Sequence, residues 1–422
     1  MHDVPKMHDN LSPPHQPIPD ASGPMRGHGV DTTDLAIIGA GPAGLCLARA
    51  AADSGLSVTL IERQPRSVLA EPASDGRDIA LTHRAESILR RLGVWERSPS
   101  AEIAPLREAR VSNGGSRFAM RFDAAASGRE QLGFLVSNHV IRRAAFQAAI
   151  DGGGVSLLDA AEVVTLSTTG EDGQVGLADG RSVRARLVIA ADSRLSENRR
   201  RMGIGAQMHD FGRVVIVCRL GHTRPNHGIA HECFRYGDTL AVLPMNGEQV
   251  SAVITVTADR APAILAMPAD AFAALVRARF DDRLGEMRLT GERHAYPLVG
   301  VYAHRFVARR FALIGDAAVG MHPVTAHGFN FGLYGIDTLM KAFRFARHRG
   351  NDIGAEAVLS AYQREHRLAT LPIYLGTNAL VQLFTDDRAP ARIARSALLR
   401  VADRLGPLKH TITRQLTGAA VR

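Results

Sequence analysis

A glycine-rich turn between two short apolar segments constrains the fold of this chain more than any other feature. Residues 35–38 form an apolar run, as expected of a buried parallel strand, and Gly39, Gly41 and Gly44 follow in G-x-G-x-x-G spacing. In this pattern the first glycine permits a tight turn, the second lets a pyrophosphate approach the backbone, and the third lets the next helix pack closely. The sequence therefore predicts a dinucleotide-binding β-α-β unit.

A second apolar strand, residues 58–61, ends in Glu62, which lies about twenty residues beyond the glycines. A carboxylate at this place accepts hydrogen bonds from the ribose of FAD or NAD and disfavours the phosphorylated ribose of NADP. Arg63 follows Glu62 and is predicted to contact the same ligand. These residues by themselves leave FAD and NAD as alternatives.

The segment 310–333, RFALIGDAAVGMHPVTAHGFNFGL, contains a second pattern. It resembles GDAAHxxxPxxGxGxN, the third motif of the one-component flavoprotein aromatic hydroxylases, the group that includes para-hydroxybenzoate hydroxylase. In that family the aspartate contacts the ribityl hydroxyls, and the stretch after the proline opens a helix aimed at the isoalloxazine. The resemblance therefore implies FAD. The matching residues, implied as cofactor-binding, are Gly315, Asp316, Pro323, Gly328 and Asn330.

The segment 187–200, LVIAADSRLSENRR, is similar to the middle motif of the same family, DGxxSxxR. Asp192 matches its aspartate, whereas Ser193 stands where the family has glycine. The family's loop touches both the flavin and the pyridine nucleotide, so NAD(P)H is the implied reductant, with another electron donor as the alternative. The basic run 199–201 either attracts the phosphates of that nucleotide or forms a solvated surface.

Three segments resemble a narrower group, the ubiquinone-biosynthesis hydroxylases. In that group an arginine equivalent to Arg77 lies near the flavin, and an Asn or Gln equivalent to Asn138 faces the ribityl chain. Phe329 carries the likeness in the third segment and is included among the implied cofactor contacts. The segments are residues 76–97, residues 133–142 and MHPVTAHGFNFG at 321–332.

The resemblance implies an FAD-dependent monooxygenase that hydroxylates the benzoquinol ring of a ubiquinone precursor through a flavin C4a-hydroperoxide, with O2 as co-substrate. Departures at Val319, Ala326 and His327 resemble the branch acting on 5-demethoxyubiquinol. His322 and His327 are candidate general bases, because histidine titrates near neutrality; structural hydrogen bonding is the alternative for both.

Other functions remain open on the sequence alone. A hydroxylase of another aromatic substrate, or a prenyl-lipid reductase without oxygen insertion, would use the same FAD motifs. A non-catalytic subunit that holds FAD or lipid is a third class. The implied partners are a polyprenylated quinol and either a ubiquinone-biosynthesis complex or a lipid-carrier protein.

The expected architecture is α/β and similar to para-hydroxybenzoate hydroxylase. It comprises a Rossmann-type FAD-binding domain, an antiparallel substrate domain predicted from alternating β-branched runs, and a helical C-terminal region. The first 33 residues contain six prolines and four histidines and are predicted to be disordered. The boundaries are 1–33 for the tail, 34–200 and 300–345 for the FAD domain, 201–299 for the substrate domain and 346–422 for the helical region.

Composition and charge indicate in which compartment the protein is expected to work and which partners it is expected to have. Three cysteines without metal-ligand spacing favour a reducing cytoplasm, and no metal site is predicted. No apolar run approaches the length of a membrane span. From residue 388 onward the sequence contains eight basic residues and one acidic residue, with apolar residues at helical spacing. This basic tail is predicted either to lie on the inner membrane or to pack on the protein body. No recognition motif accompanies the charge, which argues against nucleic acid.

Overall fold

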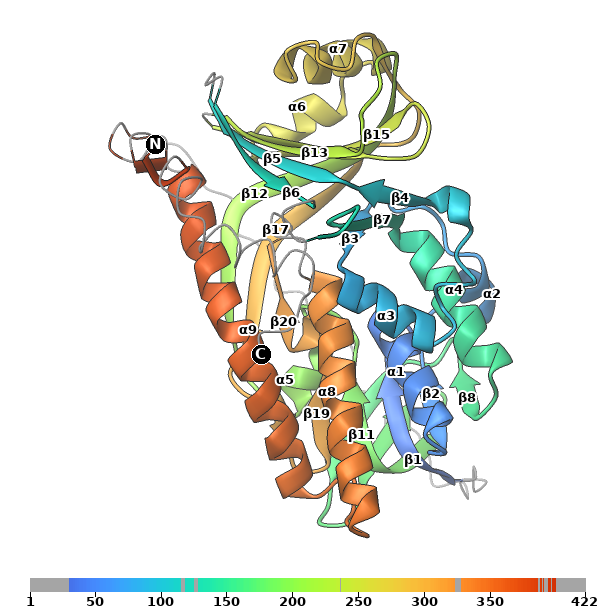
Figure 1. Ribbon diagram of the computed structural model, residues 1–422. Coiled ribbons are helices and arrows are strands. Elements are labelled where there is room, and N and C mark those ends of the chain that lie inside the picture. Colours follow the sequence, from blue (N-terminus) through green and yellow to red (C-terminus); the bar gives the residue numbers. More distant parts are fainter. Residues whose placement is uncertain are drawn as a thin grey trace, which may run out of the picture.

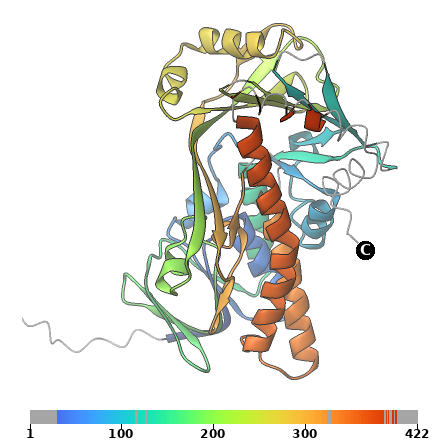
Figure 2. The ribbon, with the colours of Figure 1, turned by 90° about the vertical axis from the view of Figure 1, so that its left-hand side faces the viewer.

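The chain folds around two large sheets, with a pair of long helices along one side (Figures 1 and 2). A computed structural model describes residues 30–114, 118–124, 128–235, 237–322 and 328–385, together with positions 388, 390, 394, 395 and 397–399.

The first sheet carries the glycine turn at the end of its central strand. Its strands run in the order β18-β19-β11-β1-β2-β8, and every pairing from β19 to β8 is parallel. A parallel sheet is buried on both faces, and Leu35 and Ile37 of the central strand are fully buried. The strands are β1 (Val30–Ile38), β2 (Val58–Ile61), β8 (Val155–Leu158), β11 (Ser182–Ala190), β18 (Val307–Ala308) and β19 (Phe311–Leu313), with β9 (Val163–Thr168) and β10 (Gly173–Leu177) paired antiparallel beyond β11.

Four helices support this sheet. Helix α1 (Pro42–Asp53) follows the glycine turn and packs between α4 (Asn138–Asp151) and α8 (Gly328–His348). Helix α9 (Glu356–Thr385) packs along α8. Because α1 is covered on two sides, its buried residues are mostly small. Its N-terminus follows the carboxyl end of the central strand β1.

The second sheet is mainly antiparallel and lies above the first in Figure 1. Its order is β20-β17-β12-β15-β14-β13-β5-β6, with β16 (Met287–Leu289) paired to β12. Its outer face is covered by α6 (Ala261–Leu265) and α7 (Ala269–Arg279), whose Phe272 and Val276 are fully buried. The strands are β5 (Glu108–Asn113), β6 (Ala119–Asp123), β12 (Ala206–His222), β13 (Ile229–Phe234), β14 (Thr239–Pro244), β15 (Gln249–Thr257), β17 (His294–Ala303) and β20 (Val319–Gly320).

A three-stranded sheet in the order β3-β7-β4 connects the two larger ones. It consists of β3 (Asp78–Leu81), β7 (Gly133–Ser137) and β4 (Ile103–Leu106). The remaining short elements are α2 (Arg66–Ala70), α3 (His83–Arg91), η1 (Ser100–Glu102), α5 (Glu197–Arg201) and η3 (Gly315–Ala317).

The structure corrects the predicted N-terminal tail. Residues 1–29 lie outside the described residues, but 30–33 are the first part of β1 rather than disordered. They pair with residues 182–185 of β11, because that strand is nine residues long and offers backbone partners beyond the apolar run.

Strand pairing also crosses the predicted domain boundaries. Strands β5 and β6 fall within 34–200, the range predicted for the FAD domain, yet β5 pairs with β13 of the second sheet. A division by sequence range misses this pairing because the partner strand β13 comes about 120 residues later in the chain.

The basic tail is described at only a few positions, and one of them differs from expectation. Arg395 is fully buried, so this side chain is not part of a lipid-facing basic surface. Its neighbours Arg392, Arg400 and Arg404 lie outside the described residues. Within the described part of the chain, no helix has both the length and the apolar character needed to cross a membrane.

Candidate functional site

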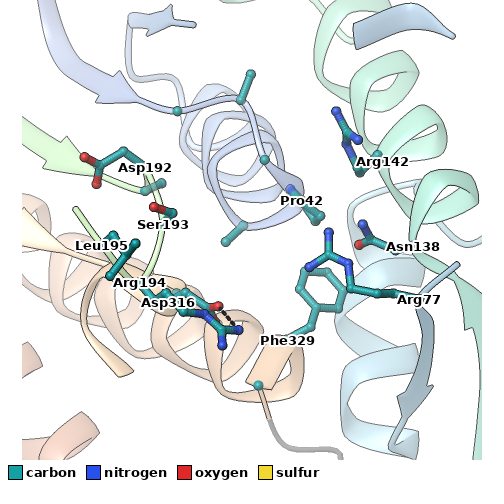
Figure 3. A pocket seen from close by; sticks show the side chains of 18 of the residues that line it. Pro42, Arg77, Asn138, Arg142, Asp192, Ser193, Arg194, Leu195, Asp316 and Phe329 are labelled. Atoms are coloured by element: carbon teal, nitrogen blue, oxygen red, sulfur yellow. Dashed lines mark hydrogen bonds and ion pairs between the residues drawn. The ribbon is translucent and has the colours of Figure 1, made fainter. Parts of the chain in front are cut away.

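A cavity of about 920 Å³ lies between the two large sheets, at the N-termini of α1 and α8. Figure 3 shows side chains entering it from opposite sides: Arg77, Asn138 and Arg142 from one, and the loop that follows β11 from the other. The cavity brings together segments that are far apart in sequence. Of the predicted site residues, it is lined by Gly39, Gly41, Glu62, Arg63, Arg77, Asn138, Asp192, Gly315, Asp316, His322, Gly328 and Phe329.

The three glycines of the first turn have different surroundings. Gly39 has a φ of +107°, and a Cβ on it would stand 2.7 Å from the carbonyl oxygen of Ala191. A Cβ on Gly44 would stand 1.9 Å from the carbonyl oxygen of Gly39, whereas one on Gly41 would meet no atom within 4 Å. Gly44 therefore serves close packing and does not line the cavity, while Gly41 leaves space for a ligand.

This turn fits the diphosphate of FAD. Gly41 is the N-cap of α1 and no side chain caps that helix end, so its first amide groups and its positive dipole end are available to an anion. Glu62 stands at the tip of β2, where its carboxylate accepts hydrogen bonds from the amides of Ala40 at 2.7 Å and Gln64 at 3.0 Å. Glu62 also lines the cavity, so the residue predicted to bind the ribose fixes the turn beside the predicted diphosphate site.

Asp75, which the sequence did not single out, holds two predicted cofactor residues together. Its Oδ2 accepts from Arg77 Nη2 at 2.6 Å and from Asn138 Nδ2 at 2.7 Å. Burial by itself would raise the pKa of Asp75, but the charge and hydrogen bonds of Arg77 and the amide of Asn138 lower it. Asp75 therefore stays ionised and orients both side chains at the cavity wall.

Arg142 is a second residue that sequence reasoning missed. It lines the cavity one helical turn after Asn138 and donates a hydrogen bond to Gln64 Oε1 at 3.3 Å. Residues four positions apart share a helix face, so the spacing from Asn138 was the available signal.

The loop after β11 supplies charged groups on the opposite wall. Asp192 Oδ2 accepts from Asn198 Nδ2 at 2.9 Å, while its Oδ1 is buried without a hydrogen-bond partner in the described structure. Asp192 is among the residues that line the cavity, but this oxygen is covered by protein atoms, so the carboxylate chiefly orders the loop through Asn198. Arg194 Nη2 pairs with Asp316 Oδ2 at 3.0 Å, which links this loop to the third motif.

The structure separates the three arginines of the basic run 199–201. Arg199 is buried and donates hydrogen bonds to the carbonyl oxygens of Arg194 and Ala317, so it fits neither a phosphate site nor a solvated surface. Arg200 and Arg201 line the cavity and remain candidates for phosphate contacts.

Ser193 occupies a backbone conformation that suits glycine, with a φ of +137°. Holding a non-glycine residue in this conformation costs about 1–3 kcal/mol of folding free energy. Replacement by glycine removes this cost, but glycine loses more backbone entropy on folding, which cancels part of the gain. We expect Ser193→Gly to raise the free energy of unfolding by about 1 kcal/mol in denaturant titrations.

A control substitution on the same loop, Ser196→Ala, is expected to lower the free energy of unfolding instead of raising it. Ser196 caps α5 by accepting from the amide of Arg199 at 2.9 Å, so Ser196→Ala should cost about 1 kcal/mol. If Ser193→Gly left stability unchanged or lowered it, the strain at this position would be refuted.

Asn330 is placed differently from the prediction. Its Oδ1 accepts from the amide of Thr82 at 3.1 Å and its Nδ2 donates to the carbonyl of Ala80 at 2.8 Å, and it is not among the cavity-lining residues. Its side chain is used to fasten the first turn of α8 to the end of β3, which positions the cavity wall. Pro323 and His327 lie outside the described residues.

His322 lines the cavity but is buried, with its ring edge-on to Phe211 at 5.1 Å between centroids. Burial lowers the pKa of His322 to about 3, with Arg213 and Arg194 acting in the same direction. The ring is therefore neutral at physiological pH and a weak base. A general-base role for His322 stays a prediction that this environment disfavours.

Comparison with known proteins agrees with the geometry. A family model described as an FAD binding domain matches residues 32–370. The chain is 47% identical over 390 residues to ubiquinone hydroxylase UbiM of Neisseria meningitidis serogroup C, covering 92% of this chain and 85% of that protein. It is 36% identical to ubiquinone hydroxylase UbiL of Rhodospirillum rubrum, with 95% and 93% covered.

Solved structures match the fold. The p-nitrophenol 4-monooxygenase PnpA of Pseudomonas putida aligns with a TM-score of 0.74 at 18% identity, covering 93% of this chain and 100% of that one. The predicted α/β architecture and FAD as the cofactor are confirmed. The chain belongs to the FAD-binding family of flavin-dependent monooxygenases, and within it to the group that contains the ubiquinone hydroxylases.

Proposed function

We propose that this monooxygenase hydroxylates the benzoquinol ring of a ubiquinone precursor, with 5-demethoxyubiquinol as the specific candidate. NAD(P)H is the proposed reductant and O2 the co-substrate. The names of the two relatives, both ubiquinone hydroxylases, support the substrate class. FAD, when bound and reduced, supplies the activation of oxygen, and the protein supplies position and exclusion of water.

The observation that carries this proposal is the continuity of the cavity. The FAD-binding turn opens into a region roofed by the inner face of β14 and β15, where Ala241, Leu243 and Val253 are apolar. Phe329 enters from the start of α8 (Figure 3). An apolar aromatic ring can therefore lie beside the cofactor, away from bulk water.

The test uses the purified holoenzyme with a short-chain 5-demethoxyquinol, NAD(P)H and isotopically labelled O2. The expected product gains one labelled oxygen atom on its ring, detected by mass spectrometry. Label that arrives only from water would contradict oxygen insertion, and turnover without O2 would indicate a reductase. Bound quinol without any turnover would favour a non-catalytic subunit.

We also propose that the protein works at the surface of an anionic membrane, since a polyprenyl tail is insoluble in water. Leu368 and Leu375 of α9 are 72% and 52% exposed and lie seven residues apart, hence on one helix face. The basic C-terminal segment follows this helix directly and complements anionic lipid. Delivery of the quinol by a lipid-carrier protein or within a biosynthetic complex is part of the same proposal.

Replacing Leu368 and Leu375 together by aspartate is expected to weaken co-sedimentation with anionic liposomes about thirtyfold, or ~2 kcal/mol. Each leucine would lose apolar contact with lipid, and each new carboxylate would be repelled. Val164→Asp, at another exposed apolar position, on β9, is the control and should leave sedimentation unchanged. Undiminished binding of the double variant would exclude α9 as the contact surface.

A further inference from the structure

A carboxyl group in the roof of the cavity has no role in the site described so far. Glu232 lies on β13, and its side chain lines the cavity. Within the described structure its carboxyl has no hydrogen bond and no ion pair. An acid that lines a ligand cavity without a protein partner is free to meet a group of the ligand.

The sheet register explains why Glu232 faces the cavity. Side chains alternate between the faces of a strand, and the neighbours His231 and Cys233 point to the outer face, toward α7. On the inner face Glu232 is flanked in register by Val111 of β5 and Ala241 of β14.

The residues in register with Glu232 are apolar, and the hydroxyl-bearing Thr239 and Thr255 lie two positions along β14 and β15 on the same cavity wall. Neither residue beside it in the register can titrate, and the row continues across β15 and β12 as Val253 and Val217. Burial raises the pKa of Glu232 to about 8.

The row ends at His294 of β17, and on the same face of β12 Arg219 is paired with Asp78 at 2.9 Å while Arg213 donates to the carbonyl oxygen of Gly237. On the cavity wall His322 is neutral and Arg77 is paired with Asp75.

We propose that the Glu232 carboxyl group hydrogen-bonds to a ring hydroxyl of the quinol and accepts its proton when the ring is hydroxylated. The step moves one proton and no electrons: the O–H bond of the ring breaks, and an O–H bond forms on the carboxylate. The resulting phenolate oxygen then accepts a hydrogen bond from the carboxylic acid. This inference rests on the proposed function, because it names the protein group that meets the quinol.

The raised pKa of Glu232 makes this proton transfer feasible. A phenol has a pKa of about 10, so proton transfer to an ordinary exposed glutamate is unfavourable by a factor of roughly 500,000. Transfer to a carboxylate whose pKa is about 8 is unfavourable by only about a hundredfold. His322, with a pKa of about 3, would be a far weaker acceptor.

The kinetic test compares the holoenzyme with Glu232→Gln on a short-chain 5-demethoxyquinol between about pH 6 and pH 10. Wild-type kcat/KM is expected to rise with pH, with a midpoint near 8 set by ionisation of Glu232. In the variant that rise should vanish and kcat/KM should fall about a hundredfold. Glu232→Asp, which keeps the acid on a shorter side chain, should retain a pH-dependent rise.

Glu108→Gln is the matched control, because Glu108 is on the adjacent strand β5 and pairs with Arg110 at 2.6 Å. Its loss should leave the midpoint and the rate unchanged.

A second measurement does not depend on turnover. Between about pH 4.5 and 8 the unfolded protein releases the Glu232 proton while the folded protein retains it, so wild-type stability declines as pH rises. Glu232→Gln lacks this penalty. The variant should therefore melt at a higher temperature than wild type near pH 8 and at the same temperature near pH 4.

The outcomes separate this proposal from the proposed function. If wild type hydroxylates the quinol and Glu232→Gln keeps its rate and pH profile, Glu232 does not exchange the proton and the inference is overturned. Equal melting temperatures at every pH would overturn it as well. If wild type hydroxylates no quinol, the proposed function fails, and the role of Glu232 toward a quinol fails with it.

Discussion

Gly41→Val is expected to yield a folded protein that has lost its yellow flavin. No atom lies within 4 Å of a Cβ at Gly41, and that space faces the cavity at the N-terminus of α1. A valine would fill the place of the diphosphate and keep it from the amide groups of the helix end. We expect the affinity for FAD to fall at least about a hundredfold, or ~2.7 kcal/mol, measured as flavin retained per protein after desalting.

The fold should survive this change. Gly41 has φ −70° and ψ 174°, an extended conformation that valine adopts readily. Circular dichroism and the melting temperature of the apoprotein should therefore match those of wild-type apoprotein. Gly41→Ala, with its smaller side chain, should lose less flavin. Full flavin content in the valine variant would show that the diphosphate does not lie on this turn.

In contrast to Gly41→Val, Gly44→Ala is expected to destabilise the fold itself. The added Cβ would stand 1.9 Å from the carbonyl oxygen of Gly39, so α1 or the turn must move by more than an ångström. We expect the apoprotein to lose roughly 3 kcal/mol of unfolding free energy in denaturant titrations.

The sign of this result is diagnostic, because alanine normally stabilises a helix by up to about 1 kcal/mol relative to glycine. Gly376 provides the matched control: it is within α9, and a Cβ there would meet nothing within 4 Å. Gly376→Ala should therefore stabilise the protein slightly. A stabilised Gly44→Ala would mean that the helix does not pack against the strand as closely as described.

The parts of the site that were predictable are those formed by adjacent residues. The glycine turn with Glu62 depends on one strand, one helix and the next strand, so its spacing is visible in the sequence. The family resemblance extended this to Asp316 and Phe329, which the structure brings to the same cavity. The unusual Ser193 was also recognisable, because it stands where the motif has glycine.

The parts that were missed or misplaced depend on contacts between distant segments. Asn330 matches a motif, but its amide binds backbone groups some 250 residues earlier, which no local pattern reveals. Glu232 became visible only through strand register, because a shift of one residue would have turned it to the outer face. Arg395 is basic and near the end of a charged tail, yet tertiary packing buries it.

The scattered origin of the cavity walls has a consequence for how cells make this protein. The walls run from Ile38 to Gly332, and a ribosome that adds about 5–20 residues per second needs roughly 15 to 60 seconds to span them. Until α8 has emerged, the vitamin-derived cofactor has only part of its site, and β1 lacks its partner β11 for much of that time. FAD stabilises by mass action only the completed fold. FAD is made from riboflavin, so the amount of folded protein that accumulates should rise with the supply of riboflavin during synthesis.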